Sequence, residues 1–267
     1  MAYKTPKQIA EAACTAACAK AGLSSSKQLV LGFLAGAFIA LGGLLAIIVG
    51  KGSPELGATN PGLAKFLFGA VFPVGLMAVI IAGAELFTGN SGLLPIGCLS
   101  GKVAWMALLR NWVFVYLGNF IGSLFVALAL SYWTGLVQGG DLGKASAAIA
   151  EAKVSLTWIQ AILRGVGCNW LVVLAVWMAI GAEDIAGKIL AIWFPIMTFV
   201  AMGMEHSIAN MFFIPLGMLN GANVSIGQFL FSNLLPVTIG NIIGGGVLVG
   251  AIYWWVYLRD DQAAAAK

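Results

Sequence analysis

Two short polar stretches inside long apolar runs decide the fold of this chain. The first reads Ala84-Glu85-Leu86-Phe87-Thr88-Gly89-Asn90-Ser91-Gly92, and the second reads Gly203-Met204-Glu205-His206-Ser207-Ile208-Ala209-Asn210. Glycine, threonine, serine and asparagine weaken helical structure, so each stretch predicts a break in an otherwise helical segment. Broken backbone at membrane depth is tolerated only where it is buried in protein or lines a polar cavity. The two breaks therefore predict a pore lined by both.

The composition shows why the membrane is the relevant environment. Hydrophobic residues make up 61% of the 267 residues and charged residues only 9%, whereas soluble domains carry about 25% charged residues. Crossing the hydrocarbon as a helix takes roughly 20 apolar residues. We therefore predict an all-α integral membrane protein with six transmembrane helices in one channel domain, 28–258. The apolar runs are Gln28–Gly50, Phe66–Ala84 with a continuation to about Leu99, Val103–Val137, Leu156–Ala182, Ile185–Leu219 and Gln228–Leu258.

The two halves of the chain repeat a set of landmarks in the same order. The pattern N-x3-V-x2-G-N-x-I-G occurs at 111–122 and again at 233–244, and Phe-Pro occurs at 72–73 and 194–195. Glu-x4-Asn occurs at 85–90 and 205–210. Each half, about 28–137 and about 156–258, holds three spans. Because three is odd, the halves must enter the membrane from opposite sides, which predicts an inverted repeat with a binding site near the bilayer midplane.

The charges at the two ends of the chain predict its orientation. Residues 1–27 carry four lysines and favour a short amphipathic helix on the membrane surface. If both termini share one side, that side holds most of the Lys and Arg residues, and the positive-inside rule places it in the cytoplasm. We therefore expect a plasma-membrane protein with a cytoplasmic segment at 1–27 and a cytoplasmic tail at 259–267. Lys51, Lys65, Lys144 and Lys153 fall on the outer side.

His206 is the first candidate for chemistry, because it is the single histidine and lies at the second break. Ionisable groups inside a membrane are costly and are functional by default. Thr88, in the first break, has a hydroxyl that can donate to an anion or to a neutral imidazole. Glu85 and Glu205 lie beside the breaks, where a carboxylate can accept from the unpaired amides that open the next half-helix. We therefore predict a structural capping role for both glutamates.

Two cations lie near the start of the fourth predicted helix. Lys153 lies just before it, where a lysine either draws anions toward a pore mouth or anchors the helix at the interface. Arg164 lies inside the start of the same helix and faces either a pore or a neighbouring subunit. The chain carries no Walker loop, GxGxxG, HExxH or GxSxG motif. We therefore expect no enzyme activity, no cofactor and no metal site.

The sequence resembles the formate/nitrite transporter family across nearly the whole membrane region. The matching stretches occur in family order. They are Ala84-Glu-Leu-Phe-Thr88, Asn111-Trp with Val115-Tyr-Leu-Gly-Asn119, Cys168-Asn-Trp-Leu-Val-Val-Leu-Ala-Val-Trp177, Glu205-His-Ser-Ile-Ala-Asn-Met-Phe212 with Ile214-Pro215, and Asn233-Leu-Leu-Pro-Val-Thr-Ile-Gly-Asn-Ile-Ile-Gly-Gly245. The resemblance implies an aquaporin-like protomer, a homopentamer with a pore in each subunit, and transport of small weak-acid anions: formate, nitrite or hydrosulfide.

The resemblance also implies roles for individual residues. The family's central histidine falls on His206, its hydrogen-bonding threonine on Thr88 and its vestibule lysine on Lys153. Asn169 and Asn210 lie in matching stretches and are expected to face the pore. The expected constrictions are Phe72, Leu76 and Phe199 on the cytoplasmic side, and Leu86, Phe87 and Val172 on the outer side.

These roles lead to a transport hypothesis. In it Lys153 concentrates the anion, the apolar walls favour its neutral acid, and His206 supplies or relays a proton. Expected partners are the anion, protons, lipid and sister subunits, without nucleic acid.

Three other functions share parts of this pattern. A water or glycerol channel has the same inferred topology, but it carries an Asn-Pro-Ala motif in each half, and only Asn60-Pro61-Gly62 resembles one here. A membrane-embedded enzyme would need a second acid or base beside His206. An ammonia channel pairs two pore histidines, whereas this chain has one. Formate is the favoured substrate, with nitrite or hydrosulfide as the alternatives within the family.

Overall fold

The structure is a computed structural model that describes residues 3–260. Within this range the regular secondary structure is helical, and one isolated bridge joins Tyr3 and Ala182. The elements are α1 (Pro6–Gly22), α2 (Ser25–Lys51), α3 (Pro54–Thr59), α4 (Pro61–Val71), α5 (Val74–Met77), η1 (Ala78–Gly83), α6 (Phe87–Leu99), α7 (Trp105–Phe125), η2 (Val126–Tyr132), α8 (Gly140–Val154), α9 (Trp158–Gly181), α10 (Ile185–Ala201), α11 (Ser207–Leu219), η3 (Gln228–Leu234), α12 (Leu235–Ile242), η4 (Ile243–Ala251) and α13 (Ile252–Tyr257). The predicted all-α membrane fold is confirmed.

Five continuous helical segments are long and apolar enough to cross a membrane. They are Ser25–Lys51, Pro61–Gly83, Trp105–Tyr132, Trp158–Gly181 and Gln228–Tyr257. Two shorter apolar helices, Ile185–Ala201 and Ser207–Leu219, follow one another in the second half. Many of their large apolar side chains point outward, as expected where lipid is the solvent.

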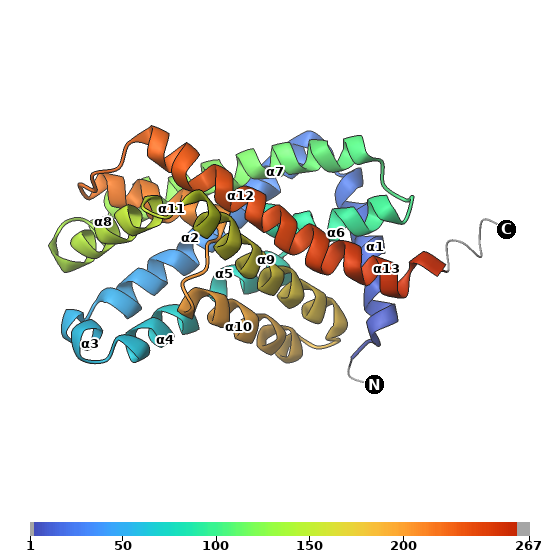
Figure 1. Cartoon of the computed structure of the whole chain (residues 1–267), viewed down its shortest axis with the longest axis horizontal. Coiled ribbons are helices and arrows are strands. Elements are labelled where there is room, and N and C mark those ends of the chain that lie inside the picture. The colour runs from blue at the N-terminus through green and yellow to red at the C-terminus, as the bar shows by residue number, and fades with distance from the viewer. Residues whose placement is uncertain (1–2, 261–267) are drawn as a thin grey trace.

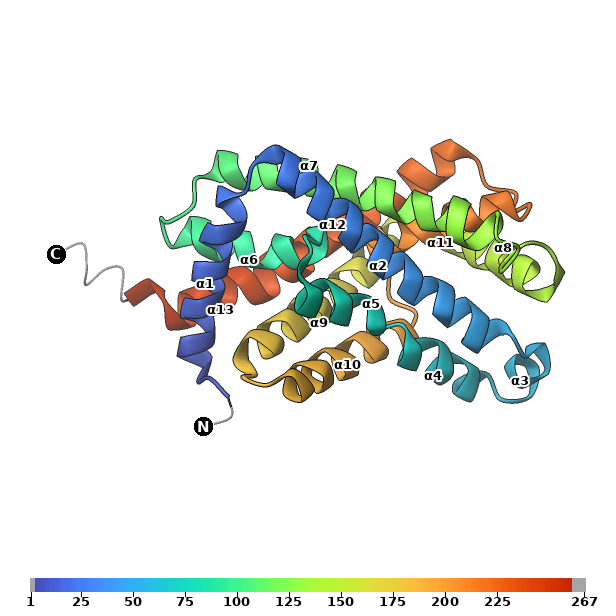
Figure 2. The same ribbon diagram turned by 180° about the vertical axis from the view of Figure 1, so that it is seen from behind.

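Both predicted breaks occur, and they occur at equivalent places. The first helix pair is interrupted between Gly83 and Phe87, and the second between Ala201 and Ser207. Gly83 and Gly203 each adopt a positive φ, 89° and 73°, which L side chains rarely do. The half-helices α6 and α11 then run to opposite ends of the molecule (Figures 1 and 2). The sequence therefore predicted both the position of the breaks and their inverted relation.

Close helix crossings hold the two halves in the same way. Helix α2 packs along α7, and α9 packs along α12. A side chain added at Gly122 would overlap the carbonyl oxygen of Phe33, and one added at Gly244 would overlap that of Val166. Only glycine permits this distance between backbones, as is usual where membrane helices pack closely. The two glycines belong to the N-x3-V-x2-G-N-x-I-G landmarks, so the repeated pattern marks the helix contacts.

Another landmark is not equivalent in space. Phe72 is 2% exposed and belongs to the core, whereas Phe194 is 55% exposed. Pro73 follows the end of α4, whereas Pro195 lies inside α10. The match of the two Phe-Pro pairs is therefore a likeness of sequence and not of position. The remaining landmarks carry the repeat.

The first helix packs on the helical bundle, and its expected place at the membrane surface stays a prediction. Ala10, Ala13 and Ala17 of α1 are fully buried, and α1 contacts α6, α9 and α13. The backbone amide of Lys4 donates to the carbonyl oxygen of Gly181 at 2.9 Å. Small side chains let α1 approach the bundle closely. Helices α1 and α13 lie at the same end of the molecule, while α3 and α8 lie at the other (Figure 1). Most of the predicted tail at 259–267 lies outside the described residues.

Candidate functional site

Two asparagines hold the breaks in place. Asn119 Oδ1 accepts from the backbone amide of Phe87 at 3.0 Å, while its Nδ2 donates to the carbonyl oxygens of Glu85 and Gly32 at 2.9 and 2.8 Å. In the second half Asn241 makes the equivalent contacts, with Ser207, Glu205 and Gly165 at 2.9, 3.0 and 2.8 Å. Both side chains are fully buried. They satisfy backbone groups that the breaks leave without helical partners.

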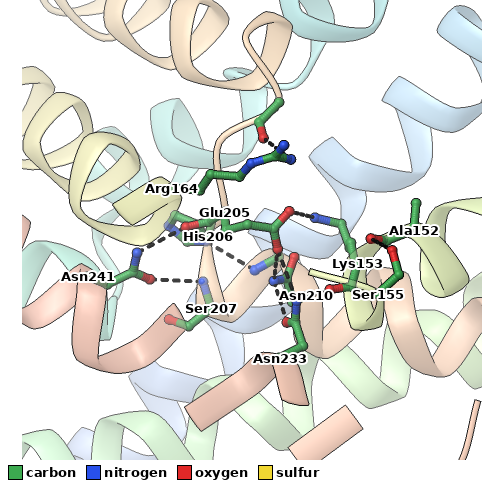
Figure 3. Close-up of polar contacts among 12 residues, drawn as sticks. Ala152, Lys153, Ser155, Arg164, Glu205, His206, Ser207, Asn210, Asn233 and Asn241 are labelled. Atoms are coloured by element: carbon green, nitrogen blue, oxygen red, sulfur yellow. Dashed lines mark hydrogen bonds and ion pairs between the residues drawn. The ribbon is translucent and has the colours of Figure 1, made fainter. Parts of the chain in front are cut away.

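The glutamates therefore do not cap the half-helices, and that prediction is corrected. Glu85 accepts from Lys20 Nζ and from Asn90 Nδ2, both at 2.7 Å. Glu205 accepts from Lys153 Nζ at 2.9 Å and from Asn210 Nδ2 at 2.6 Å (Figure 3). The carboxylates are directed at lysine ammonium groups, whose charge stabilises a buried carboxylate more than a neutral amide can.

A second pair of asparagines extends this network to the lysines. Asn111 Oδ1 accepts from Asn90 at 2.8 Å, and Asn233 Oδ1 accepts from Asn210 at 2.7 Å. Asn233 Nδ2 donates to the carbonyl oxygen of Lys153 at 2.9 Å, and Asn111 Nδ2 makes the equivalent contact with Lys20 at 3.5 Å. At each break, one lysine, one glutamate and three buried asparagines thus adopt the same arrangement.

Lys20 was not among the residues predicted from the sequence. It is the counterpart of Lys153, because α1 and α8 pack on α6 and α11 at opposite ends of the molecule. No local motif marks it, since Lys20 and Glu85 are 65 residues apart. The equivalence of Glu85 and Glu205 was visible, and two buried carboxylates of one kind call for two cationic partners. The presence of two such glutamates therefore indicates that one of the lysines in the first 27 residues pairs with Glu85.

His206 and Thr88 meet where the two breaks approach each other. The backbone amide of Ala209 donates to His206 Nδ1 at 3.0 Å, and His206 Nε2 lies 3.0 Å from Thr88 Oγ1. Because Nδ1 accepts, a neutral ring carries its hydrogen on Nε2 and donates it to Thr88. The threonine hydroxyl is then the acceptor of this bond, and its own hydrogen can serve a further acceptor. A doubly protonated ring would turn Nδ1 into a donor and lose the contact with Ala209.

Two cavities lead toward this pair from opposite ends. One, of about 320 Å³, is lined by Lys153, Glu205, His206 and Asn210; we call it the Lys153 vestibule. The other, of about 370 Å³, is lined by Lys20, Glu85 and Asn90; we call it the Lys20 vestibule. Between them lies a gap with no room for a water molecule. Its walls are Ile39, Phe72, Leu76, Leu86, Val172, Ile196, Phe199 and His206.

Five of the six expected constriction residues line this gap, and three of them, Phe72, Phe199 and Leu86, lie on the side opposite to the one expected, whereas Leu76 lies on its expected side. Phe72 and Phe199 also line the Lys153 vestibule, whereas Leu76 and Leu86 line the Lys20 vestibule. The second run starts on the Lys153 side and reaches Phe72 before Leu76, so the phenylalanine must lie nearer Lys153. The aromatic pair, with ring centroids 6.1 Å apart, therefore belongs to the side predicted as outer.

Phe87 does not line the gap between the vestibules. Its ring contacts the edges of Trp112 and Tyr116, with centroids 5.7 and 4.8 Å apart. It borders a separate apolar cavity between α7 and the last helical run. Leu86 is the extended residue before α6 and Phe87 is the first residue of that helix, so the two neighbouring side chains line different cavities. The expectation that Phe87 forms part of the constriction is not supported by this geometry.

Asn169 and Asn210, the two other expected pore residues, have different surroundings. Asn210 lines the Lys153 vestibule. Asn169 is fully buried, and its Nδ2 donates to Thr88 O, Ser91 Oγ and Asn241 O at 3.1, 2.9 and 2.7 Å. Asn169 therefore ties the first half to the second and fixes the backbone that presents Thr88.

The single Asn-Pro pair that resembled a water-channel motif lies outside this arrangement. Asn60 Oδ1 accepts from the backbone amide of Leu63 at 3.0 Å and so caps α4, with Pro61 as the first helical residue. Capping of this kind is the ordinary use of asparagine at a helix start. The pair therefore gives no support to a water or glycerol channel.

Comparisons with known proteins agree on one relationship. The family model described as formate/nitrite transporter matches residues 7–255. The chain is 50% identical to a protein of Methanothermobacter thermautotrophicus named "Probable formate transporter", over 97% of this chain and 98% of that protein. The fold of the present chain is similar to that of a solved "FNT family ion channel", with a TM-score of 0.85 and 33% identity. The match covers 93% of this chain and 98% of that one. The fold is also similar to that of a solved "Pentameric formate channel with formate bound" with a TM-score of 0.76 and 35% identity, covering 88% and 98%.

Proposed function

The chain belongs to the formate/nitrite transporter family of multi-pass membrane proteins, and from this premise we propose that it conducts formate through a pore in each protomer. Nitrite and hydrosulfide are the alternatives within the family. The names of its relatives support a formate substrate. The observation that carries the proposal is the placement of His206 at a dry gap between two lysine-lined vestibules.

The two vestibules and the gap impose opposite requirements on a small anion. Each mouth is lined by a lysine ammonium group, which can donate a hydrogen bond to an anion. A gap without water strips the hydration shell, and the effective penalty for a desolvated ion is several kcal/mol. The neutral acid avoids most of this cost, so crossing favours a protonated form. Weak acids satisfy both requirements, because they are anions in water and become neutral by gaining one proton.

His206 lines the gap and is bonded to the fully buried Thr88 behind it, and in this proposal the pair supplies the polar contact there. A neutral His206 donates from Nε2 to Thr88, and the threonine hydrogen can bond an oxygen of the passing solute. A lasting imidazolium would lose the contact between Nδ1 and Ala209 N at the start of α11. Protonation near His206 is therefore transient in this proposal, with the ring as relay. Removing the ring should change how flux depends on pH.

The assembly and orientation complete the proposal. Counting α10 and α11 as two halves of one crossing gives six crossings, with α1 and α13 on the same side. The positive-inside rule assigns that side to the cytoplasm of the cell that carries the protein in its plasma membrane. A homopentamer, like the solved pentameric formate channel, would place five separate pores in parallel.

A flux comparison tests the function directly. Protein reconstituted in liposomes should pass formate faster than glycerol or urea, and nitrite and hydrosulfide serve as the competing substrates. Uptake should depend on pH between about pH 5 and about pH 8, because the relay takes its proton from the solution. His206→Asn should abolish that pH dependence. Unchanged pH-dependent flux in His206→Asn would exclude the relay, and preferential passage of glycerol would exclude the anion channel.

A further inference from the structure

The two vestibules differ in charge although their frameworks are alike. Lys20 and Glu85 are the charged residues that line the Lys20 vestibule, and they pair with each other. The Lys153 vestibule is lined by the equivalent pair, Lys153 and Glu205, and by three further cations: Lys51, Lys65 and Arg164. Among residues 3–260 none of these three lies within ion-pair distance of a carboxylate. After pairing, one vestibule is neutral and the other carries an excess of three positive charges.

Arg164 is the one of these cations whose counterpart in the first half is identified by hydrogen bonds. The backbone amide of Glu205 donates to the carbonyl oxygen of Arg164 at 3.3 Å, and that of Glu85 donates to the carbonyl oxygen of Leu31 at 3.2 Å. The next residues, Gly165 and Gly32, accept from Asn241 and Asn119. Arg164 and Leu31 thus occupy equivalent positions, and each lines its own vestibule.

The side chain of Arg164 has more N–H donors than hydrogen-bond acceptors near it. Its Nη1 lies 3.4 Å from the carbonyl oxygen of Gly203, a long contact, and the residue is exposed (Figure 3). A guanidinium carries five N–H donors in a fixed fork that matches a carboxylate. Lys153, by contrast, is held by Glu205 at 2.9 Å. An anion entering this vestibule therefore finds in Arg164 an unneutralised charge beside the break that carries His206.

We propose that Arg164 is an anion-capture residue that makes the two mouths of the pore kinetically unequal. This inference rests on the proposed anion conduction. A passive pore without a second driving force must have equal permeability in both directions at low concentration. The asymmetry therefore appears on saturation: the anion half-saturates from the Lys153 side at a lower concentration than from the Lys20 side. The effect is electrostatic and weakens as salt shortens the Debye length from about 10 Å at 0.1 M to about 3 Å at 1 M.

The test compares half-saturation concentrations for formate from each side of liposomes, in low salt. Orientation is scored by protease cleavage of a tag placed after Lys267. Arg164→Leu, which copies the other half, should raise the half-saturation concentration on the Lys153 side roughly fivefold, the effect of one unit charge about 4 Å away across water. The value on the Lys20 side should stay unchanged. Leu31→Arg should produce the mirror result by lowering the value on the Lys20 side.

Two conservative variants separate charge from structure. Arg164→Gln keeps a donor for Gly203 but no charge and should behave like Arg164→Leu, whereas Arg164→Lys should keep most of the wild-type value. Roughly 1 M salt should reduce the difference between wild type and Arg164→Leu. Equal half-saturation on both sides of the wild type, or identical values for the Lys and Gln variants, would overturn the inference. Absence of formate flux in the wild type would instead overturn the proposed function.

Discussion

The two breaks share one framework and differ in a few side chains. In both, a Lys–Glu pair and three asparagines hold the interrupted backbone. The two halves differ at the residue after the glutamate. Leu86 is the N-cap of α6 and makes no side-chain cap, whereas His206 is the N-cap of α11 and its side chain accepts from the backbone amide of Ala209. The comparison teaches that duplication supplies the architecture of the pore, while chemistry and direction come from the positions where the copies differ.

The largest expected effect concerns the shared framework. Asn119→Leu should leave two buried backbone groups without partners, the amide of Phe87 and the carbonyl of Glu85, at roughly 1–3 kcal/mol for each group. We expect a loss of about 3 kcal/mol or more in unfolding free energy, measured by SDS titration of the protein in detergent. Asn241→Leu should lose a similar amount. A large loss in one variant with little change in the other would break the equivalence of the two halves.

The ion pairs come next. Lys153→Met leaves Glu205 buried without its cation, and breaking a buried pair costs about 3 kcal/mol or somewhat more. Lys20→Met should cost less, because the side chain of Lys20 is more exposed, 21% against 15%. The same titration measures both losses. Adding Glu205→Gln to Lys153→Met should restore much of the stability, and failure to do so would show that Lys153 acts through packing.

The equivalent helix crossings of the two halves predict a smaller loss of stability. Gly122→Ala and Gly244→Ala each place a methyl group against a carbonyl oxygen of the neighbouring helix. Overpacking of this kind typically costs 1–3 kcal/mol, so we expect about 2 kcal/mol for each variant. Gly57→Ala, where an added side chain meets open space, is the matched control. Equal thermal stability of all three variants in detergent would contradict the close crossings.

The smallest expected loss of stability tests the point where the halves differ. Thr88→Val keeps the shape of the side chain but removes the acceptor for His206 Nε2, with an expected cost of about 1 kcal/mol. Formate flux should lose part of its pH dependence, as measured in liposomes. Ile208 follows Glu205 as Thr88 follows Glu85, so Ile208→Val is the control and should keep the wild-type pH profile. A wild-type profile in Thr88→Val would remove the hydroxyl from the proposal.

Features that arise from local chemistry and from repetition were predictable from the order of the residues alone. Apolar runs of crossing length, glycine and polar residues at the two breaks, and the recurring asparagine–glycine pattern predicted the membrane fold and its inverted halves. The single histidine at the second break, together with the family resemblance, predicted the pair that His206 forms with Thr88. These inferences hold because helix breaking and hydrophobic length depend on residues close together in the chain.

Which side chains contact each other depends on the packing of helices that are distant in the chain. Lys20 reaches Glu85 across 65 residues, and Asn241 reaches Ser207 across 34. A carboxylate beside a break can accept from an amide or from an ammonium, and the choice depends on which helix packs against it. The exchanged sides of Phe72 and Leu86 and the neutral and basic vestibules follow from the same packing. Contacts between distant segments have no local pattern, because folding selects them from many partners of similar chemistry.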